Sequence, residues 1–230
     1  MCASNVALTP AVAVPDLTKY SRGVPVHVIS HPVAQDTLLH LRDARTDSAG
    51  FRLAAQRLSL LVAIEATRDL PTAATTVHTP LGPAHGQEID ADVVVVPVLR
   101  AGLGMLDAVL GVVPRARVGY IGLQRDESTA VASQYYAKFP VGLDRSYVLL
   151  VDPMLATGGS AVAALHLLAA RGARAVRLLC IVAAPEGIGE VQAHFPDVHI
   201  YTPVIDEALN QHKFIVPGLG DFGDRLYGTA

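Results

Sequence analysis

Residues 151–161, with the sequence VDPMLATGGSA, combine an acidic side chain, two hydroxyl side chains and two consecutive glycines. Gly158 and Gly159 allow backbone N–H groups to approach an anion closely, and Thr157 and Ser160 add hydroxyl donors. A helix that begins near Ser160 would turn the positive end of its dipole, about half a charge, toward the loop. These residue types predict a phosphate-binding loop. It is not a Walker loop, because no lysine follows the glycines.

The elements around this loop predict an α/β fold with a mostly parallel central sheet flanked by helices. The run Val93 to Val96 is continuous and β-branched, and three further apolar runs follow: ARVGYIGL, SYVLLVD and AVRLLCIVAA. Alanine- and leucine-rich stretches separate several of them, which is the pattern of strands buried on both faces. Ligands bind outside the carboxyl ends of such strands, and the loop follows one of these ends.

Residues 35–70 have a helical pattern, and a connection containing proline and histidine follows them. The apolar side chains expected to form the core faces of these helices are Leu38, Leu39, Leu41, Phe51, Leu58, Leu61 and Ile64. None of the apolar runs reaches the roughly 20 residues that a membrane span requires.

Two segments interrupt the alternation of strands and helices. Residues 124–145 are long for a plain connection, which predicts a functional lid loop. Tyr135 and Tyr136 would pack within this lid or at a subunit contact, and the sequence leaves both alternatives open. The tail IVPGLGDFGDRLYGTA, residues 215–230, is too rich in glycine to predict a helix. Residues 1–25 are expected to form a loosely ordered extension that carries no secretory signal.

Four separated motifs resemble one known family. DPMLATGGS resembles the loop that binds phosphoribosyl diphosphate (PRPP) in type I phosphoribosyltransferases, in particular in the uracil phosphoribosyltransferase family. VPVLRAGLGM, VAAPEGI and IVPGLGDFGDR match the same family in order and spacing. The resemblance runs from about Val26 to the C-terminus. It implies a single domain over residues 26–230, with a small hood built from terminal segments, which holds the base, and with a flexible lid loop.

The resemblance also implies roles for residues. Arg100, Arg125 and Asp221 are the implied catalytic residues, and the two arginines would hold the diphosphate of PRPP. The implied PRPP-binding set also contains Asp152, Pro153, Met154, Leu155, Ala156, Thr157, Gly158, Gly159 and Ser160. The implied uracil-binding residues are Ile215, Gly220, Asp221 and Phe222, mainly through their backbone. Phe222 is bulkier than its counterpart in some relatives. A non-proline cis peptide bond is implied between Leu99 and Gly102.

By the same resemblance the activity would be pyrimidine salvage, in which the phosphoribosyl group of PRPP passes to N1 of uracil to give UMP and diphosphate. Purine-type relatives have an acidic residue where this chain has Ala156, so no side-chain general base is evident there. Mg²⁺ is the implied cofactor, held mainly by PRPP oxygens and water, with Asp221 as the candidate protein ligand. Two rival functions remain: transfer to another base such as a purine, and a catalytically silent nucleotide sensor.

Composition limits the partners. The 230 residues include 18 basic and 21 acidic side chains with no basic block, which argues against binding to nucleic acid. The two cysteines, Cys2 and Cys180, form no metal motif and fit a reducing cytoplasm. The spacing of the nine histidines does not favour a metal site. Relatives are commonly dimers or higher assemblies and some respond to GTP, so a homodimer or larger homo-oligomer and a GTP effector are further expectations.

Overall fold

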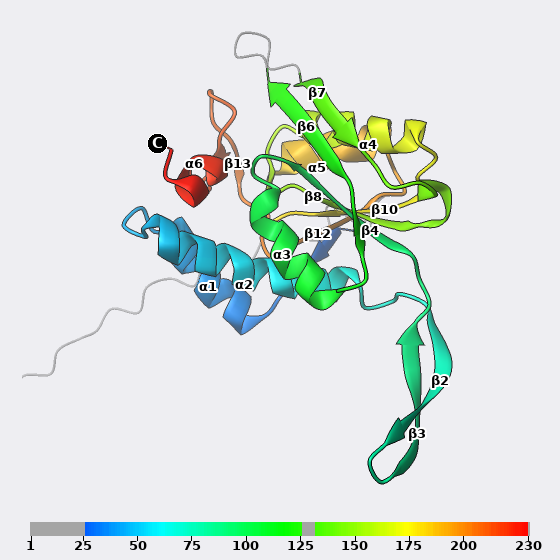
Figure 1. The fold of residues 1–230 in the computed structure, drawn as a ribbon. Coiled ribbons are helices and arrows are strands. Elements are labelled where there is room, and N and C mark those ends of the chain that lie inside the picture. Colours follow the sequence, from blue (N-terminus) through cyan, green and yellow to red (C-terminus); the bar gives the residue numbers. More distant parts are fainter. Residues whose placement is uncertain (1–25, 126–131, 230) are drawn as a thin grey trace, which may run out of the picture.

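The computed structural model describes residues 26–125 and 132–229, and a predominantly parallel sheet forms its centre (Figure 1). The strands are β1 Val26–Val28, β4 Val93–Leu99, β5 Arg117–Val118, β6 Tyr120–Arg125, β7 Ala132–Lys138, β8 Tyr147–Val151, β10 Ala175–Leu179 and β12 His199–Thr202. They lie in the order β1, β12, β10, β8, β4, β6 and β7, and β5 also pairs with β4. Every pairing is parallel except that of β6 with β7. The predicted fold class is confirmed.

Helices cover both faces of the sheet, which explains the continuous apolar run in β4 (Figure 1). The helices are α1 Pro32–Arg42, α2 Ser48–Ala66, α3 Leu103–Val112, α4 Gly159–Ala170 and α5 Pro185–His194. Val93 and Val95 belong to the core shared with α1, α2 and α3, whereas Val94 and Val96 belong to the core shared with α4 and α5. Alternate side chains of a strand point to opposite faces, so β4 needs apolar residues at every position. No helix within the described ranges is both long and apolar enough to span a membrane.

The predicted core faces of α1 and α2 are partly wrong. Leu38, Leu41, Phe51 and Leu58 are buried, but the prediction fails at Leu39, which is 69% exposed, and at Ile64, which is 52% exposed. Consecutive helical residues differ by about 100° in direction, so Leu39 cannot share the face of Leu38. Ile64 lies thirteen positions after Phe51, which places it on the far side of α2.

The connection predicted between the helices and the first strand contains a hairpin that the sequence pattern did not predict. β2, Thr72–Thr79, pairs in antiparallel register with β3, Gly82–Ile89. The hairpin projects from the rest of the molecule (Figure 1). Nearly all of its side chains are exposed, so it lacks the alternation of apolar and polar residues from which half-buried strands are recognised.

The predicted lid, residues 124–145, is not one long connection. From residue 132 on it contains β7, which pairs with β6, and the short 3₁₀ helix η2, Leu143–Arg145. Tyr135 packs across this hairpin, because a methyl group added at Gly122 would lie 2.5 Å from its ring. Tyr136 is 43% exposed. Residues 126–131, at the centre of the predicted lid, and the predicted extension, residues 1–25, lie outside the described residues.

The prediction that the tail forms no helix is wrong. The helix α6 spans Phe222–Tyr227, after the small strands β13, Ala208–Leu209, and β14, Ile215–Val216. The glycines of the tail mark the ends of this helix more than its interior. Asp221 is the N-cap and accepts a hydrogen bond from the N–H of Asp224 at 2.9 Å, and Gly228 ends the helix with a left-handed backbone.

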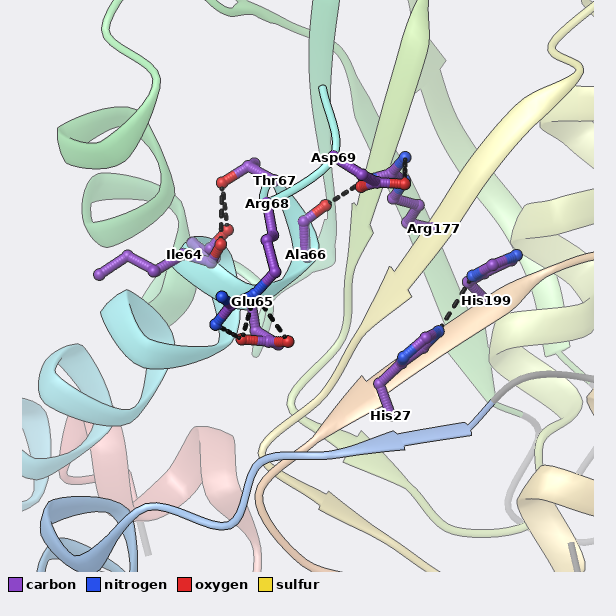
Figure 2. A network of polar contacts seen from close by, with 10 residues as sticks. His27, Ile64, Glu65, Ala66, Thr67, Arg68, Asp69, Arg177 and His199 are labelled. Atoms are coloured by element: carbon purple, nitrogen blue, oxygen red, sulfur yellow. Dashed lines mark hydrogen bonds and ion pairs between the residues drawn. The ribbon is translucent and has the colours of Figure 1, made fainter. Parts of the chain in front are cut away.

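A group of polar contacts lies where the end of α2 meets the edge of the sheet (Figure 2). The carboxylate of Asp69 accepts two hydrogen bonds from the guanidinium of Arg177 on β10, at 2.6 and 3.1 Å. Nε2 of His27 on β1 lies 3.0 Å from Nδ1 of His199 on β12, and the His27 ring stacks on Tyr201 with 4.4 Å between centroids. Side chains thus connect the edge strand β1 to β12 in addition to the backbone ladder.

Candidate active site

The predicted phosphate loop lies at the carboxyl end of β8, as the sequence indicates. Gly158 has a left-handed backbone with φ of 83° and is the N-cap of α4, so the first N–H groups of α4 lie at the end of the loop. A Cβ atom at Gly158 would lie 2.7 Å from Cβ of Glu190 and 2.9 Å from the carbonyl oxygen of Gly187. Only glycine therefore fits between this loop and α5.

The rest of the loop is held by backbone pairing and is not a free connection. Its strand β9, Met154–Leu155, pairs with β11, Val182–Ala183. The carbonyl oxygen of Pro153 accepts hydrogen bonds from Ile181 and Val182 at 2.9 and 3.0 Å. Pro153 and Leu155 are buried, so their side chains support the loop, while Asp152, Thr157 and Ser160 are partly exposed at its surface.

Arg100 follows β4, next to the phosphate loop. The Leu99–Arg100 peptide bond is cis, which confirms the predicted non-proline cis bond. The Arg100 side chain is 64% exposed, and its Nη2 lies 3.9 Å from Oδ1 of Asp224. This contact is too long for a strong ion pair, so the guanidinium can reach an anion. The hydroxyl of Tyr227 donates to the Arg100 carbonyl oxygen at 3.3 Å.

Close packing brings the Arg100 segment, the phosphate loop and the tail together. A Cβ atom at Gly102 would lie 2.5 Å from the carbonyl oxygen of Val151, the residue before the phosphate loop. A Cβ atom at Gly104 would lie 2.7 Å from the Leu226 side chain and 3.1 Å from the Phe222 ring. Segments that are far apart in the sequence therefore meet at the carboxyl ends of β4 and β8.

The tail packs beside Gly104, and its predicted contact with the base stays a prediction. The Phe222 ring is buried and packs edge-on against Phe51, with 5.2 Å between centroids. Its bulk therefore fills the core beside α2. Ile215 is also buried, whereas Gly220 and Asp221 are exposed. The carboxylate of Asp221 accepts one hydrogen bond within its own helix, and as an exposed group it can bind a second partner.

The structure describes only the backbone of Arg125. This residue ends β6 and pairs with Ala132, immediately before residues 126–131, which are not described. Its predicted contact with diphosphate stays a prediction. Among the described residues, no group of three or more His, Cys, Asp or Glu side chains lies close enough together to hold a metal ion.

Burial raises the pKa values of two side chains near the site, the thiol of Cys180 and the hydroxyl of Tyr227. Cys180, at the end of β10, is fully buried, which raises the pKa of its thiol to about 12. The nearby charge of Asp152 contributes to this shift, and the thiol therefore stays protonated and unreactive at neutral pH. Burial also raises the pKa of Tyr227, partly offset by the positive charge of Arg100, so its hydroxyl remains a hydrogen-bond donor.

The sequence pattern did not single out Asp224 and Tyr227, although both contact Arg100. The spacing of Asp221 and Asp224 could have indicated them, because it is typical of a helix N-cap followed by an acidic first turn. The glycine content of the tail instead led to the prediction that no helix forms there. Once α6 exists, its 3.6-residue period places residues 224 and 227 on the same side.

Comparisons with known proteins agree with this geometry. A family model described as uracil phosphoribosyltransferase matches residues 28–229. Uracil phosphoribosyltransferase from Dictyoglomus thermophilum is 50% identical over 205 residues, which cover 89% of this chain and 99% of that protein. The protein of the same name from Shouchella clausii is 48% identical, with coverage of 89% and 98%. The solved structure of the AQ2163 protein from Aquifex aeolicus superposes with a TM-score of 0.85 at 35% identity, covering 89% of this chain and 99% of that one. The chain belongs to the uracil phosphoribosyltransferase family.

Proposed function

We propose that the protein transfers the 5-phosphoribosyl group of PRPP to N1 of uracil, giving UMP and diphosphate in pyrimidine salvage. The observation that supports this most directly is the close packing of Gly102 against the end of β8 and of Gly104 against α6. This packing brings together the loop that would bind phosphate, the exposed Arg100 and the tail whose backbone would face the base. PRPP carries negative charge at its 5-phosphate and at its diphosphate, so it needs two anion sites, which the loop and the arginine would supply. The tail would bind the base.

The phosphate loop would hold the 5-phosphate of PRPP. The N–H groups from Thr157 to Ser160 and the start of α4 supply donors and a favourable dipole. Asp152, which is partly exposed next to this loop, would accept hydrogen bonds from the two ribose hydroxyls. Pro153, Met154, Leu155 and Ala156 would shape the loop through their backbone.

The diphosphate would lie against Arg100, with Arg125 reaching it from the end of β6. A guanidinium binds two phosphate oxygens at once, and its charge stabilises the departing diphosphate. Mg²⁺ fits this donor set, because diphosphate oxygens, water and the exposed carboxylate of Asp221 are the oxygen ligands that it prefers. When bound, Mg²⁺ would neutralise negative charge on the leaving group.

In the reaction, N1 of uracil forms a bond to C1 of the ribose while the bond from C1 to the diphosphate oxygen breaks. The bonding electron pair leaves with diphosphate, and the N1 proton passes to water or to a diphosphate oxygen. Ala156 occupies the place of an acidic residue in purine-type relatives and cannot take this proton. Catalysis would therefore rest on electrostatic stabilisation of the leaving charge.

The test is direct measurement of UMP formation from uracil, PRPP and Mg²⁺, with hypoxanthine and adenine in parallel reactions. We expect UMP with uracil and no nucleotide with either purine. Nucleotide formation from a purine alone would support the rival transfer reaction. A complete absence of turnover with all three bases, combined with tight PRPP binding, would support the nucleotide sensor.

The same preparation would test the remaining expectations. We propose a homodimer or larger homo-oligomer that works in the cytoplasm, and GTP as a candidate effector. Sedimentation measures the assembly, and initial rates with and without GTP measure activation. A monomer at assay concentration, or rates that do not depend on GTP, would contradict the respective expectation.

A further inference from the structure

Asp206 is a buried carboxylate next to the segment proposed to bind uracil. Its side chain is 3% exposed and lies between β12 and β13. Arg42, at the end of α1, donates to both of its oxygens, at 2.5 Å to Oδ1 and 2.9 Å to Oδ2. The N–H of Gly218 also donates to Oδ2 at 2.9 Å. The carboxylate thus accepts hydrogen bonds from both α1 and the tail.

Arg42 also binds the other side of Gly218. Its Nη1 donates to the Gly218 carbonyl oxygen at 2.8 Å. Both backbone polar groups of Gly218 are therefore held by one ion pair. Gly218 has φ of 57°, and a Cβ atom there would lie 2.1 Å from the carbonyl oxygen of Ile215, so the turn from Ile215 to Gly218 is tight.

A second arginine holds the next residue of the same turn. Nη1 of Arg225 donates to the carbonyl oxygens of Leu219 and Leu41, both at 2.7 Å, and Nη2 donates to the carbonyl oxygen of Asp43 at 2.6 Å. The Arg225 guanidinium also lies over the Phe51 ring, 4.5 Å from its centroid. Residues 218 and 219 are therefore attached to the C-terminal end of α1 from two sides.

We propose that the Arg42–Asp206 ion pair, supported by Arg225, is the positioning device that determines how tightly uracil binds. The inference rests on the proposed function, in which Ile215 and residues 220–222 present backbone groups to uracil. Residues 218 and 219 lie between these groups. A binding site made of backbone groups cannot adjust through side-chain rotamers, so its geometry depends on where the chain is anchored.

The discriminating experiment compares KM for uracil with KM for PRPP in conservative variants. In Arg42→Lys, a single ammonium replaces the planar fork that reaches both carboxylate oxygens and the Gly218 carbonyl. We expect KM for uracil to rise about tenfold or more while KM for PRPP stays within about twofold, since a tenfold change corresponds to only about 1.4 kcal/mol. Arg225→Lys should shift the same constant in the same direction.

Arg68→Lys is the matched control, because Arg68, which follows the end of α2, pairs at the protein surface with the carboxylate of Glu65 on α2. Both constants should stay at wild-type values in this variant. Asp206→Asn adds a second test of the pair, because the amide retains the size and one acceptor of the carboxylate. It should also raise KM for uracil selectively. Thermal unfolding of each variant shows how much of any change comes from lost stability.

Equal increases in both KM values, or a lower melting temperature with both constants unchanged in Arg42→Lys and Arg225→Lys, would show a merely structural role and overturn the inference. Wild-type protein is assayed first. If it makes no UMP from uracil, the proposed function fails and this inference fails with it. If it makes UMP but the lysine variants keep the wild-type KM for uracil, only this inference fails.

Discussion

At the scale of single residues, the candidate site combines an exposed charged side chain, that of Arg100, with a closely packed backbone beside it. Arg100 is 64% exposed although Leu99 ends a buried strand and Gly102 is packed against β8. A charged side chain in such a position costs little desolvation and is held at its base by the backbone. This arrangement suits a group that stabilises charge in a transition state.

We predict that Arg100→Ala lowers turnover by about 10²–10³, the usual effect of removing one preorganised charge-stabilising group. The fold should persist, because the side chain is 64% exposed and its ion-pair contact with Asp224, within the described residues, is long at 3.9 Å. Initial rates and thermal unfolding measure the two effects, and Arg115→Ala, an exposed arginine paired with Glu88, serves as the control. Near wild-type turnover in Arg100→Ala would contradict the proposed diphosphate role.

Base selectivity is a second prediction at this scale. Uracil presents an N3–H donor between two carbonyl acceptors, whereas cytosine presents an unprotonated N3 and an amino group. The backbone groups proposed to bind uracil, near Ile215 and residues 220–222, cannot rotate to suit both bases, so bound cytosine would leave some of them unpaired. We expect discrimination by about 10⁴–10⁵ in kcat/KM. Steady-state rates with each base at equal PRPP decide this, and comparable values would refute the backbone pocket.

At the scale of elements, glycines set the distances between segments. Gly102 allows the start of α3 to approach the end of β8, and Gly158 allows the phosphate loop to approach α5. The closest neighbours of Gly102 are backbone atoms, which cannot move away as a flexible side chain can. The position of Arg100 relative to the phosphate loop is therefore determined by the contact between two backbones.

Gly102→Ala should consequently impair both stability and activity. The new Cβ atom would lie 2.5 Å from the Val151 carbonyl oxygen and 2.7 Å from backbone atoms of Val98. We expect a loss of about 1–3 kcal/mol in the free energy of unfolding. The rate should also fall, because Arg100 is displaced from the phosphate loop. Denaturant unfolding and initial rates are the measurements.

Gly189→Ala is the control for this change. Gly189 lies in α5, and a Cβ atom added there would have no neighbouring atom within 4 Å, so alanine fits and favours the helix. Stability should stay equal or rise in this variant. If Gly102→Ala behaved like Gly189→Ala in both assays, the packing argument for the site would be wrong.

At the scale of the whole molecule, contacts between distant segments hold the edge of the sheet. β1 is an edge strand of three residues, and His27 in it contacts His199 from β12 (Figure 2). The His27 ring also stacks on Tyr201 from β12. Burial and the neighbouring His199 lower the pKa of His27, and Arg177 lowers it further, whereas Glu65 and Asp69 raise it. The net direction is downward from 6.5.

This direction predicts that stability decreases in mild acid. Below about pH 6.5 His27 is protonated in the unfolded chain but still largely neutral in the folded protein. Unfolding is therefore coupled to proton uptake and becomes easier as the pH falls. Melting temperatures between pH 8 and pH 5.5 should show this decrease, and His27→Gln should reduce it. His78→Gln, on the exposed hairpin, is the control and should keep the wild-type decrease. An identical pH dependence in His27→Gln would contradict the assignment.

The structure describes residues 26–125 and 132–229 of the chain. The single domain over residues 26–230 stays a prediction, as does the function of residues 124–145 as a lid. The hairpin β2–β3 is a separate feature of the molecule that contacts little beyond its own strands. Its exposed apolar side chains include Val77 and Leu81.

The sequence alone predicted the class of fold, which the structure confirms, and a candidate site at the end of one strand. Val93 to Val96 and the run YVLLV are apolar at every position, which only a sheet covered on both faces requires, and the loop after YVLLV had the residue types for phosphate. These features are local in the chain. Helix α6 was missed because its interior is short and its glycines, which lie mostly at the ends, dominated the composition.

Which distant residues lie in contact became evident from the packing of the elements. The contact of Gly102 with Val151, the burial of the Phe222 ring against Phe51 and the Arg42–Asp206 pair join positions 49 to 171 residues apart. No periodicity reports such contacts, because they depend on how the elements pack. Exposed Leu39 and Ile64 show the same limit, since an apolar side chain is buried only where another element covers it.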